Sequence, residues 1–203
     1  MDQLTEEWFS ARCGKVTASK VCDVVTKTRS GWAASRANYM AQLLVERLTG
    51  TKEKGYTNAA MQWGIDTEPQ ARDAYVFMTD NEVEQVGFID HPYIAMSGAS
   101  PDGLVGDDGL VEIKCPNTAT HINTFITGKI DKNYIDQMQW QMACTQRAWC
   151  DFVSFDPRLP EEYQLFLKRV EFDKSRVNEL EEGVVGFNTE LQSMINELKK
   201  AAA

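Results

Sequence analysis

Apolar residues recur at the three- and four-residue spacing of a helix along several stretches of this chain. The longest stripe follows Asp173 and contains Val177, Leu180, Val184, Phe187, Leu191, Met194 and Leu198. Shorter stretches predict helices over 6–11, 35–48, 59–79 and 132–146, and another that begins near Thr17. Ser35 is expected to cap the helix over 35–48. Pro69 has no amide hydrogen, so the helix over 59–79 must kink or restart there.

Strand patterns occupy the middle of the chain and the region before the last helix. The predicted strands cover 83–89, 93–96, 103–105, 110–115, 149–155 and 163–172. Asp107, Asp108 and Gly109 predict a tight hairpin turn, and the polar stretch 28–33 predicts an exposed loop. This order predicts an α/β fold in which helices flank a central mixed β-sheet.

The composition is that of a globular protein, because 43% of the 203 residues are hydrophobic and 25% are charged. We expect one domain over residues 1–203, in which the alanines at 201–203 could be a non-native tail. The sequence has no apolar run that reaches the roughly 20 residues of a membrane span. It also has no signal-peptide pattern before Trp8. The five cysteines have no close pairing, which favours reduced thiols in a cytoplasmic protein.

The net charge of −9 argues mildly against a nucleic-acid ligand, because phosphate binding normally needs a basic excess. One segment outweighs this argument. It contains Ser-Pro-Asp-Gly at 100–103 and Glu-Ile-Lys-Cys-Pro at 112–116, joined by the predicted hairpin. The hairpin places Asp102 opposite a strand on which Glu112 and Lys114 point to the same face.

Two carboxylates and an ammonium group make a poor hydrophobic core but a good site for a cation. Asp102, Glu112 and the backbone carbonyl of Ile113 supply the hard oxygen ligands that Mg²⁺ and Mn²⁺ prefer. Lys114 would then orient a metal-activated water or stabilise the transition state. The alternative is a surface hairpin with an ordinary Glu–Lys pair.

This pattern resembles the PD-(D/E)xK nuclease superfamily and, more narrowly, the family of the phage lambda exonuclease and related viral recombination exonucleases. The resemblance extends in order from residue 8 to residue 158. Its other matching positions are Trp8, Arg12, Gly14, 17–19, 29–31, Trp63, Gly64, Glu68, Ala71, Arg72, Gln137, Gln139 and 156–158. The resemblance implies a restriction-endonuclease-like core.

The resemblance also implies the roles of the site residues. Asp102 and Glu112 match metal ligands, and Lys114 matches the catalytic lysine. Glu68 matches an acidic residue that completes the metal site, with one or two Mg²⁺ ions bound. Its alternative is a helix cap beside Pro69.

Gln137 matches a glutamine that reaches the active site from the next helix. Its alternative is a polar helix surface, together with Asp136, Gln139 and Gln141.

Four residues match a pocket for a 5′-terminal phosphate: Arg12, Ser19, Ser100 and Gln137. For Arg12, the alternative is an ion pair with Glu6 or Glu7.

Two further positions match contacts with duplex DNA. Arg29 lies where the family contacts the duplex ahead of the site, and Met61 lies where it places an apolar wedge. Met61 could equally be a core residue.

By resemblance, we expect a Mg²⁺-dependent 5′→3′ exonuclease in a bacterial cytoplasm, in a phage or prophage context and without a membrane role. It would degrade one strand of linear double-stranded DNA with a 5′-phosphate end to mononucleotides, and leave a 3′ overhang. A homotrimeric ring with a basic channel would reconcile this function with the acidic net charge, and a single-strand annealing protein would be the partner.

The alternatives are a PD-(D/E)xK endonuclease and a non-catalytic DNA-end-binding protein. An iron–sulfur cluster is disfavoured because the sequence has no Cys-x-x-Cys pair. Histidine catalysis is disfavoured because His91 and His121 have no partner motif and are expected in a loop or on a helix surface.

Overall fold

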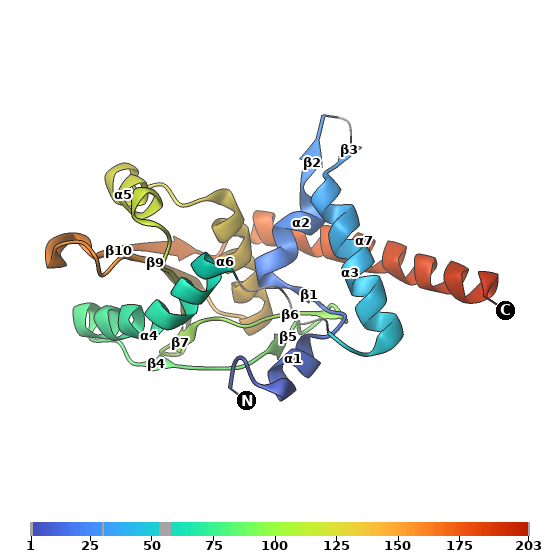
Figure 1. Cartoon of the computed structure of the whole chain (residues 1–203), viewed down its shortest axis with the longest axis horizontal. Helices are drawn as coiled ribbons and strands as arrows, with labels where there is room; N and C mark the ends of the chain where they lie inside the picture. Colours follow the sequence, from blue (N-terminus) through green and yellow to red (C-terminus); the bar gives the residue numbers. More distant parts are fainter. Residues whose placement is uncertain (1, 30, 53–57, 203) are drawn as a thin grey trace.

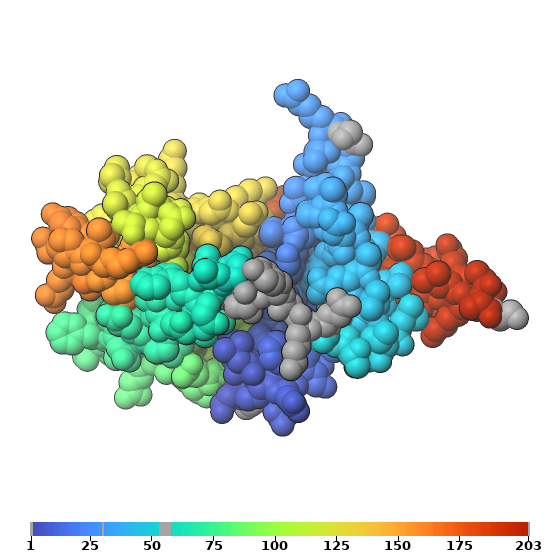
Figure 2. Space-filling view, in the orientation of Figure 1, coloured from blue at the N-terminus to red at the C-terminus, as the bar shows by residue number. Residues whose placement is uncertain are grey.

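The computed structural model describes residues 2–29, 31–52 and 58–202 of the chain. Ser30 of the predicted polar loop and Ala203 of the predicted tail lie outside the described residues. Two parts project from the body of the molecule (Figure 1 and Figure 2). They are a hairpin of β2 (Lys27–Thr28) and β3 (Gly31–Trp32), and the C-terminal part of helix α7 (Lys174–Ala201).

A five-stranded mixed sheet forms the centre of the molecule, as the sequence predicts. Its order is β10-β9-β8-β7-β4, and only β8 and β9 are parallel neighbours. The strands are β4 (Val83–Glu84), β7 (Gly103–Val105), β8 (Gly109–Lys114), β9 (Trp149–Phe155) and β10 (Leu165–Glu171). Strands β4 and β7 pair closely at Gly103, because a Cβ atom at that position would lie 2.1 Å from the Val83 side chain.

Short strands form two smaller sheets. The first has the order β1-β6-β5, built from Val16–Thr17, Ser97–Ala99 and Ile89–Asp90. The second is the β2–β3 hairpin, built from Lys27–Thr28 and Gly31–Trp32.

Three predictions of the previous section are therefore wrong in detail. Residues 83–89 are not one strand, because β4 and β5 lie in different sheets. Residues 93–96 form no strand, since Met96 has a left-handed φ of 59° that interrupts extended backbone. The exposed stretch 28–33 contains part of the β2–β3 hairpin rather than only a loop.

The helices and short 3₁₀ helices surround these sheets. They are α1 (Glu6–Arg12), η1 (Ala18–Lys20), α2 (Val21–Val25), α3 (Ala34–Thr49), α4 (Ala59–Thr79), α5 (Thr118–Thr127), α6 (Lys132–Thr145), η2 (Glu161–Tyr163) and α7 (Lys174–Ala201). Helix α5 is an addition to the predicted elements. Two residues signal this helix in the sequence. The side chain of Asn117 caps its N-terminus, and Gly128, in a left-handed conformation, ends it.

The predicted apolar stripes of the helices are buried except near the helix ends. On α7 the buried stripe continues through Leu191 to Ile195, whereas Met194 and Leu198 are exposed. Met78 is also exposed, because it lies at the end of α4 beyond the last buried turn. Helix α4 continues through Pro69 without restarting, and α3 begins at Ala34 with no side-chain cap from Ser35.

Candidate active site

Asp102 is attached to strand β8 by a hydrogen bond across the hairpin. Its Oδ2 accepts from the backbone N–H of Ile113 at 2.7 Å. Gly103, the next residue, is opposite Val111 in the β7–β8 register. The hairpin therefore places the Asp102 carboxylate beside the segment that carries Glu112 and Lys114, as its sequence spacing predicts.

Glu112 is completely buried on β8, and three side chains bind its carboxylate. Lys114 forms an ion pair with Oε1. Gln137 donates to Oε1 at 2.6 Å, and Gln141 donates to Oε2 at 2.7 Å. Both glutamines come from α6, one helical turn apart, so α6 fixes the orientation of this carboxylate.

Gln141 is a site residue that the sequence analysis missed. The proposed polar surface of α6 is wrong, because Asp136, Gln139 and Gln141 are all buried. The four-residue spacing of Gln137 and Gln141 could have indicated that Gln141 belongs to the site, since it places both amides on one helical face.

Glu68 approaches the same site from α4. It is half-buried and forms an ion pair with Arg72, one turn along the helix. The helix-cap interpretation of Glu68 is wrong, because Asn58 caps α4 and Glu68 lies in its interior. Burial raises the pKa of the Glu68 carboxyl, Arg72 opposes this shift, and the charge of Glu112 adds to it.

The electrostatics of the site are dominated by the three carboxylates. Burial raises the pKa of Asp102 well above its ordinary value, and the negative charges of Glu112 and Glu68 raise it further. Burial alone would lower the pKa of Lys114, but Glu112 and Asp102 outweigh it and raise that pKa. Lys114 therefore stays an ammonium ion among carboxylates that repel one another.

The donor set fits a hard divalent cation. Asp102, Glu112 and the Ile113 carbonyl are oxygen donors, and Mg²⁺ typically takes one or two carboxylates while it keeps several waters. A cation would also relieve the mutual repulsion of the carboxylates. Across residues 2–29, 31–52 and 58–202, however, no three His, Cys, Asp or Glu side chains are already gathered as a metal cluster.

The site opens into a cleft with a volume of about 880 Å³. Glu68, Asp102 and Lys114 lie within it, and Tyr134 of α6 places its ring 5.0 Å from Lys114 Nζ. Met61 also lines this cleft with 54% of its surface exposed, so its core interpretation is wrong.

Arg12 and Ser100 meet next to this site. Arg12 Nη1 donates to Ser100 Oγ at 3.1 Å, and Trp8 Nε1 donates to the same oxygen at 2.9 Å. The Arg12 guanidinium lies over the Trp8 ring, 3.9 Å from its centroid. No carboxylate in the described part of the chain pairs with Arg12, so the proposed ion pair with Glu6 or Glu7 is wrong.

Burial lowers the pKa of Arg12 to about 10, and the more distant Tyr39 and Glu46 only partly compensate. A half-buried cation such as Arg12, without a paired anion, is suited to bind an anionic ligand. Ser19 is exposed on η1 and forms no hydrogen bond to Arg12 or Ser100 among the described residues.

Arg29 is exposed near the tip of the β2–β3 hairpin and does not line the cleft. The structure thus separates Arg29 from the carboxylates of the cleft. The hairpin itself projects from the body (Figure 2).

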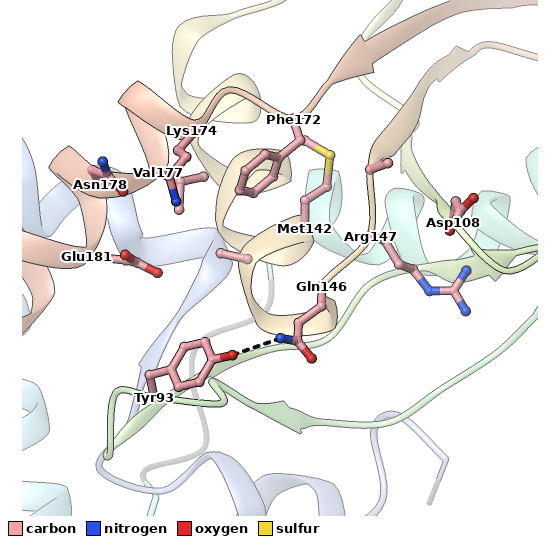
Figure 3. Close-up of a pocket in the computed structure, with 12 residues that line it drawn as sticks. Tyr93, Asp108, Met142, Gln146, Arg147, Phe172, Lys174, Val177, Asn178 and Glu181 are labelled. Carbon is pink, nitrogen blue, oxygen red and sulfur yellow. Dashed lines mark hydrogen bonds between the residues drawn. The ribbon is translucent and has the colours of Figure 1, made fainter.

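A second hollow of about 400 Å³ lies between α6 and the start of α7 (Figure 3). Tyr93, Gln146, Lys174 and Glu181 are among its lining residues, and Gln146 donates to the Tyr93 hydroxyl at 3.1 Å. It contains none of the predicted site residues.

The two histidines are buried, and the cysteines form no disulfides in the described part of the chain. His91 lies in the loop after β5, one of its two predicted positions, and is buried there. His121 is buried on α5, so its expected position on a helix surface is wrong. His121 bonds Ser154 and the Tyr163 carbonyl, both at 2.8 Å. All five cysteines are free.

No helix in the described part of the chain is both long and apolar enough to cross a membrane.

Comparison with known proteins supports the resemblance drawn from the motifs. The family described as YqaJ-like viral recombinase domain matches residues 7–148. The solved alkaline exonuclease LHK-Exo from Laribacter hongkongensis is 58% identical, with 98% of each chain covered and a TM-score of 0.92. Its complex with dAMP matches equally well. No match was found among curated proteins.

A phage-related exonuclease from Haemophilus somnus 129PT shares only 14% identity but has a TM-score of 0.72, with 91% of this chain and 96% of that chain covered. It therefore supports the fold alone. The predicted PD-(D/E)xK fold and the resemblance to viral recombination exonucleases are confirmed. The chain belongs to the YqaJ-like viral recombinase family.

Proposed function

We propose that this protein is a Mg²⁺-dependent DNA exonuclease that degrades one strand of linear duplex DNA from its 5′ end. The observation that carries the proposal is the meeting of Asp102 and Lys114 in a cleft that also contains Glu68, with the buried carboxylate of Glu112 paired to Lys114. The similarity to LHK-Exo, an alkaline exonuclease that was crystallised with dAMP, supports the reaction class and a mononucleotide product.

Asp102, Glu112, the Ile113 carbonyl and Glu68 would hold one or two Mg²⁺ ions, which Mn²⁺ could replace. When bound, such an ion stabilises negative charge on the scissile phosphate and lowers the pKa of a water molecule. Lys114 keeps its proton and orients the attacking water or donates to the phosphate oxygens in the transition state. Gln137 and Gln141 hold the Glu112 carboxylate in its binding orientation.

The 5′-terminal phosphate would bind to Arg12 and Ser100, with Ser19 and Gln137 at its edge. The Arg12 guanidinium, whose charge is only partly compensated, supports this assignment, because a guanidinium can donate two parallel hydrogen bonds to phosphate oxygens. Since Ser100 is two residues before Asp102, phosphate binding would place the first phosphodiester near the carboxylates.

Met61 would separate the terminal base pair at the cleft, and Arg29 would contact the duplex ahead of it. Both side chains are exposed, which this role needs. We further propose a homotrimeric ring around DNA and a single-strand annealing protein that receives the 3′ overhang in a bacterial cytoplasm. The chain would act as one nuclease domain over residues 1–203.

The test is digestion of linear duplex DNA with each strand labelled separately, on 5′-phosphate and 5′-hydroxyl ends, with Mg²⁺ and with a chelator. We expect Mg²⁺-dependent loss of label from phosphorylated 5′ ends and release of mononucleotides. Internal cuts or attack on closed circles would instead identify an endonuclease. DNA binding without any digestion would identify an end-binding protein.

A further inference from the structure

One wall of the cleft is formed by a tryptophan and an arginine to which the mechanism above gives no role. Trp63 of α4 and Arg158, which follows β9, both line the cleft that contains Asp102 and Lys114. The Arg158 guanidinium lies 4.5 Å from the centroid of the Trp63 ring. The two side chains therefore form a stacked pair on the cleft surface.

Arg158 is held rigidly along one edge. Its Nε and Nη2 donate to the two oxygens of Asp156 at 2.7 and 2.9 Å, and the Asp156 side chain is fully buried. Nη2 also lies 3.5 Å from the Pro116 carbonyl. Nη1 has no hydrogen-bond partner in the described part of the structure, and 47% of the side chain remains exposed.

We propose that Arg158, held by Asp156 and stacked on Trp63, binds a backbone phosphate of the DNA other than the one being hydrolysed. This inference rests on the proposed function, because it assigns the DNA contact on a second wall of the same cleft. An arginine with a fixed plane and one free edge donates to a phosphate oxygen with little loss of side-chain entropy. DNA is the ligand because the site opens beside the nuclease residues.

A purely structural role for such a pair is the alternative, and the chain contains a matched example of it. Arg169 of β10 donates to both oxygens of buried Asp151 at 2.8 and 2.9 Å. It lies 3.5 Å from the Trp149 ring centroid, and 46% of its side chain is exposed. This second pair has the same chemistry and exposure but does not line the cleft.

The experiment compares Arg158→Gln with Arg169→Gln in the full chain. DNA binding is measured without Mg²⁺, so that cleavage does not interfere, on a 5′-phosphorylated duplex and on the matching single strand over a range of salt concentrations. We expect Arg158→Gln to weaken binding roughly tenfold and to reduce the slope of log affinity against log salt by about 1. Arg169→Gln should bind as the wild type does.

The two DNA forms identify the strand that supplies the phosphate. Weaker binding of both forms places the contact on the degraded strand, whereas weaker binding of duplex alone places it on the complementary strand. Trp63→Phe keeps the ring face and should bind normally, whereas Trp63→Ala should weaken binding in the same direction as Arg158→Gln.

Equal affinity and equal salt slopes for Arg158→Gln, Arg169→Gln and the wild type would overturn the inference. Thermal melting of each variant shows whether it is folded, and Arg158→Lys, which keeps the charge but loses the bidentate geometry, provides a second test if Arg158→Gln is unstable. We expect Arg158→Lys to keep the salt slope but to lose part of the affinity. Failure of the wild type to digest DNA would contradict the proposed function instead, so the two failures are distinguishable.

Discussion

Gln141 donates a 2.7 Å hydrogen bond to Oε2 of Glu112, a carboxylate with no exposed surface. One turn earlier on α6, Gln137 donates to the other oxygen at 2.6 Å. Two neutral amides therefore position the carboxylate without adding positive charge that would compete with a cation. Lys114 supplies the only ammonium group that pairs with Glu112 in the described part of the chain.

Replacing Gln141 with Leu should destabilise the protein and weaken its response to Mg²⁺. The change leaves Glu112 Oε2 buried without its donor, which costs about 1–3 kcal/mol in the free energy of unfolding. Urea denaturation and a Mg²⁺ titration of cleavage measure the two effects. Gln192→Leu is the control, because its amide bonds only Asn196 on the exposed surface of α7. Equal stability of both variants would contradict the structural role of Gln141.

Lys114→Ala should abolish cleavage while DNA binding stays largely intact. The lysine acts mainly on charge that develops in the transition state, so we expect a loss of at least about 10²-fold in rate. Single-turnover cleavage and a Mg²⁺-free binding assay separate the two properties. Turnover near the wild-type rate would remove Lys114 from the mechanism.

Arg12→Ala should remove the preference for a 5′-phosphate end. Without the guanidinium, Ser100 and Trp8 offer only neutral contacts to the phosphate. The ratio of initial rates on 5′-phosphate and 5′-hydroxyl duplexes should fall toward one, mostly through slower cleavage of the phosphorylated end. A ratio that matches the wild type would mean that the phosphate binds elsewhere.

The sequence predicts the β7–β8 hairpin well because local rules determine it. The turn at 107–109 and the two-residue period of a strand are enough to place Asp102 against Glu112 and Lys114. The long helices follow from the same kind of periodicity, and α7 departs from its predicted stripe only after Leu191.

Contacts between distant segments could not be predicted in the same way. The Trp8–Ser100 hydrogen bond joins residues 92 positions apart, and its existence depends on the packing of α1 against the segment after β6. The burial of His121 on α5 and of Gln141 on α6 likewise depends on which helix face meets the core. Sequence spacing can place two polar side chains on one helical face, but the burial of that face depends on partners that come from other elements.

The Asp156 carboxylate accepts hydrogen bonds from Nε and Nη2 of Arg158. Burial alone would raise its pKa, but the hydrogen bonds from Arg158, together with one from Thr118, outweigh burial and lower the pKa from 3.8 to about 2. Because the folded-state pKa is depressed, the pair stabilises the fold above pH 3.8, and this contribution disappears as the pH falls through about 2. A carboxyl-detected NMR titration should therefore give Asp156 a pKa of about 2 in the wild type and a higher value in Arg158→Gln. The same titration of Arg169→Gln should leave the pKa of Asp156 unchanged, since Arg169 pairs with Asp151 instead. An Asp156 pKa that does not respond to Arg158→Gln would mean that the arginine is not held by Asp156 in solution, and that its guanidinium is not fixed in advance for a phosphate.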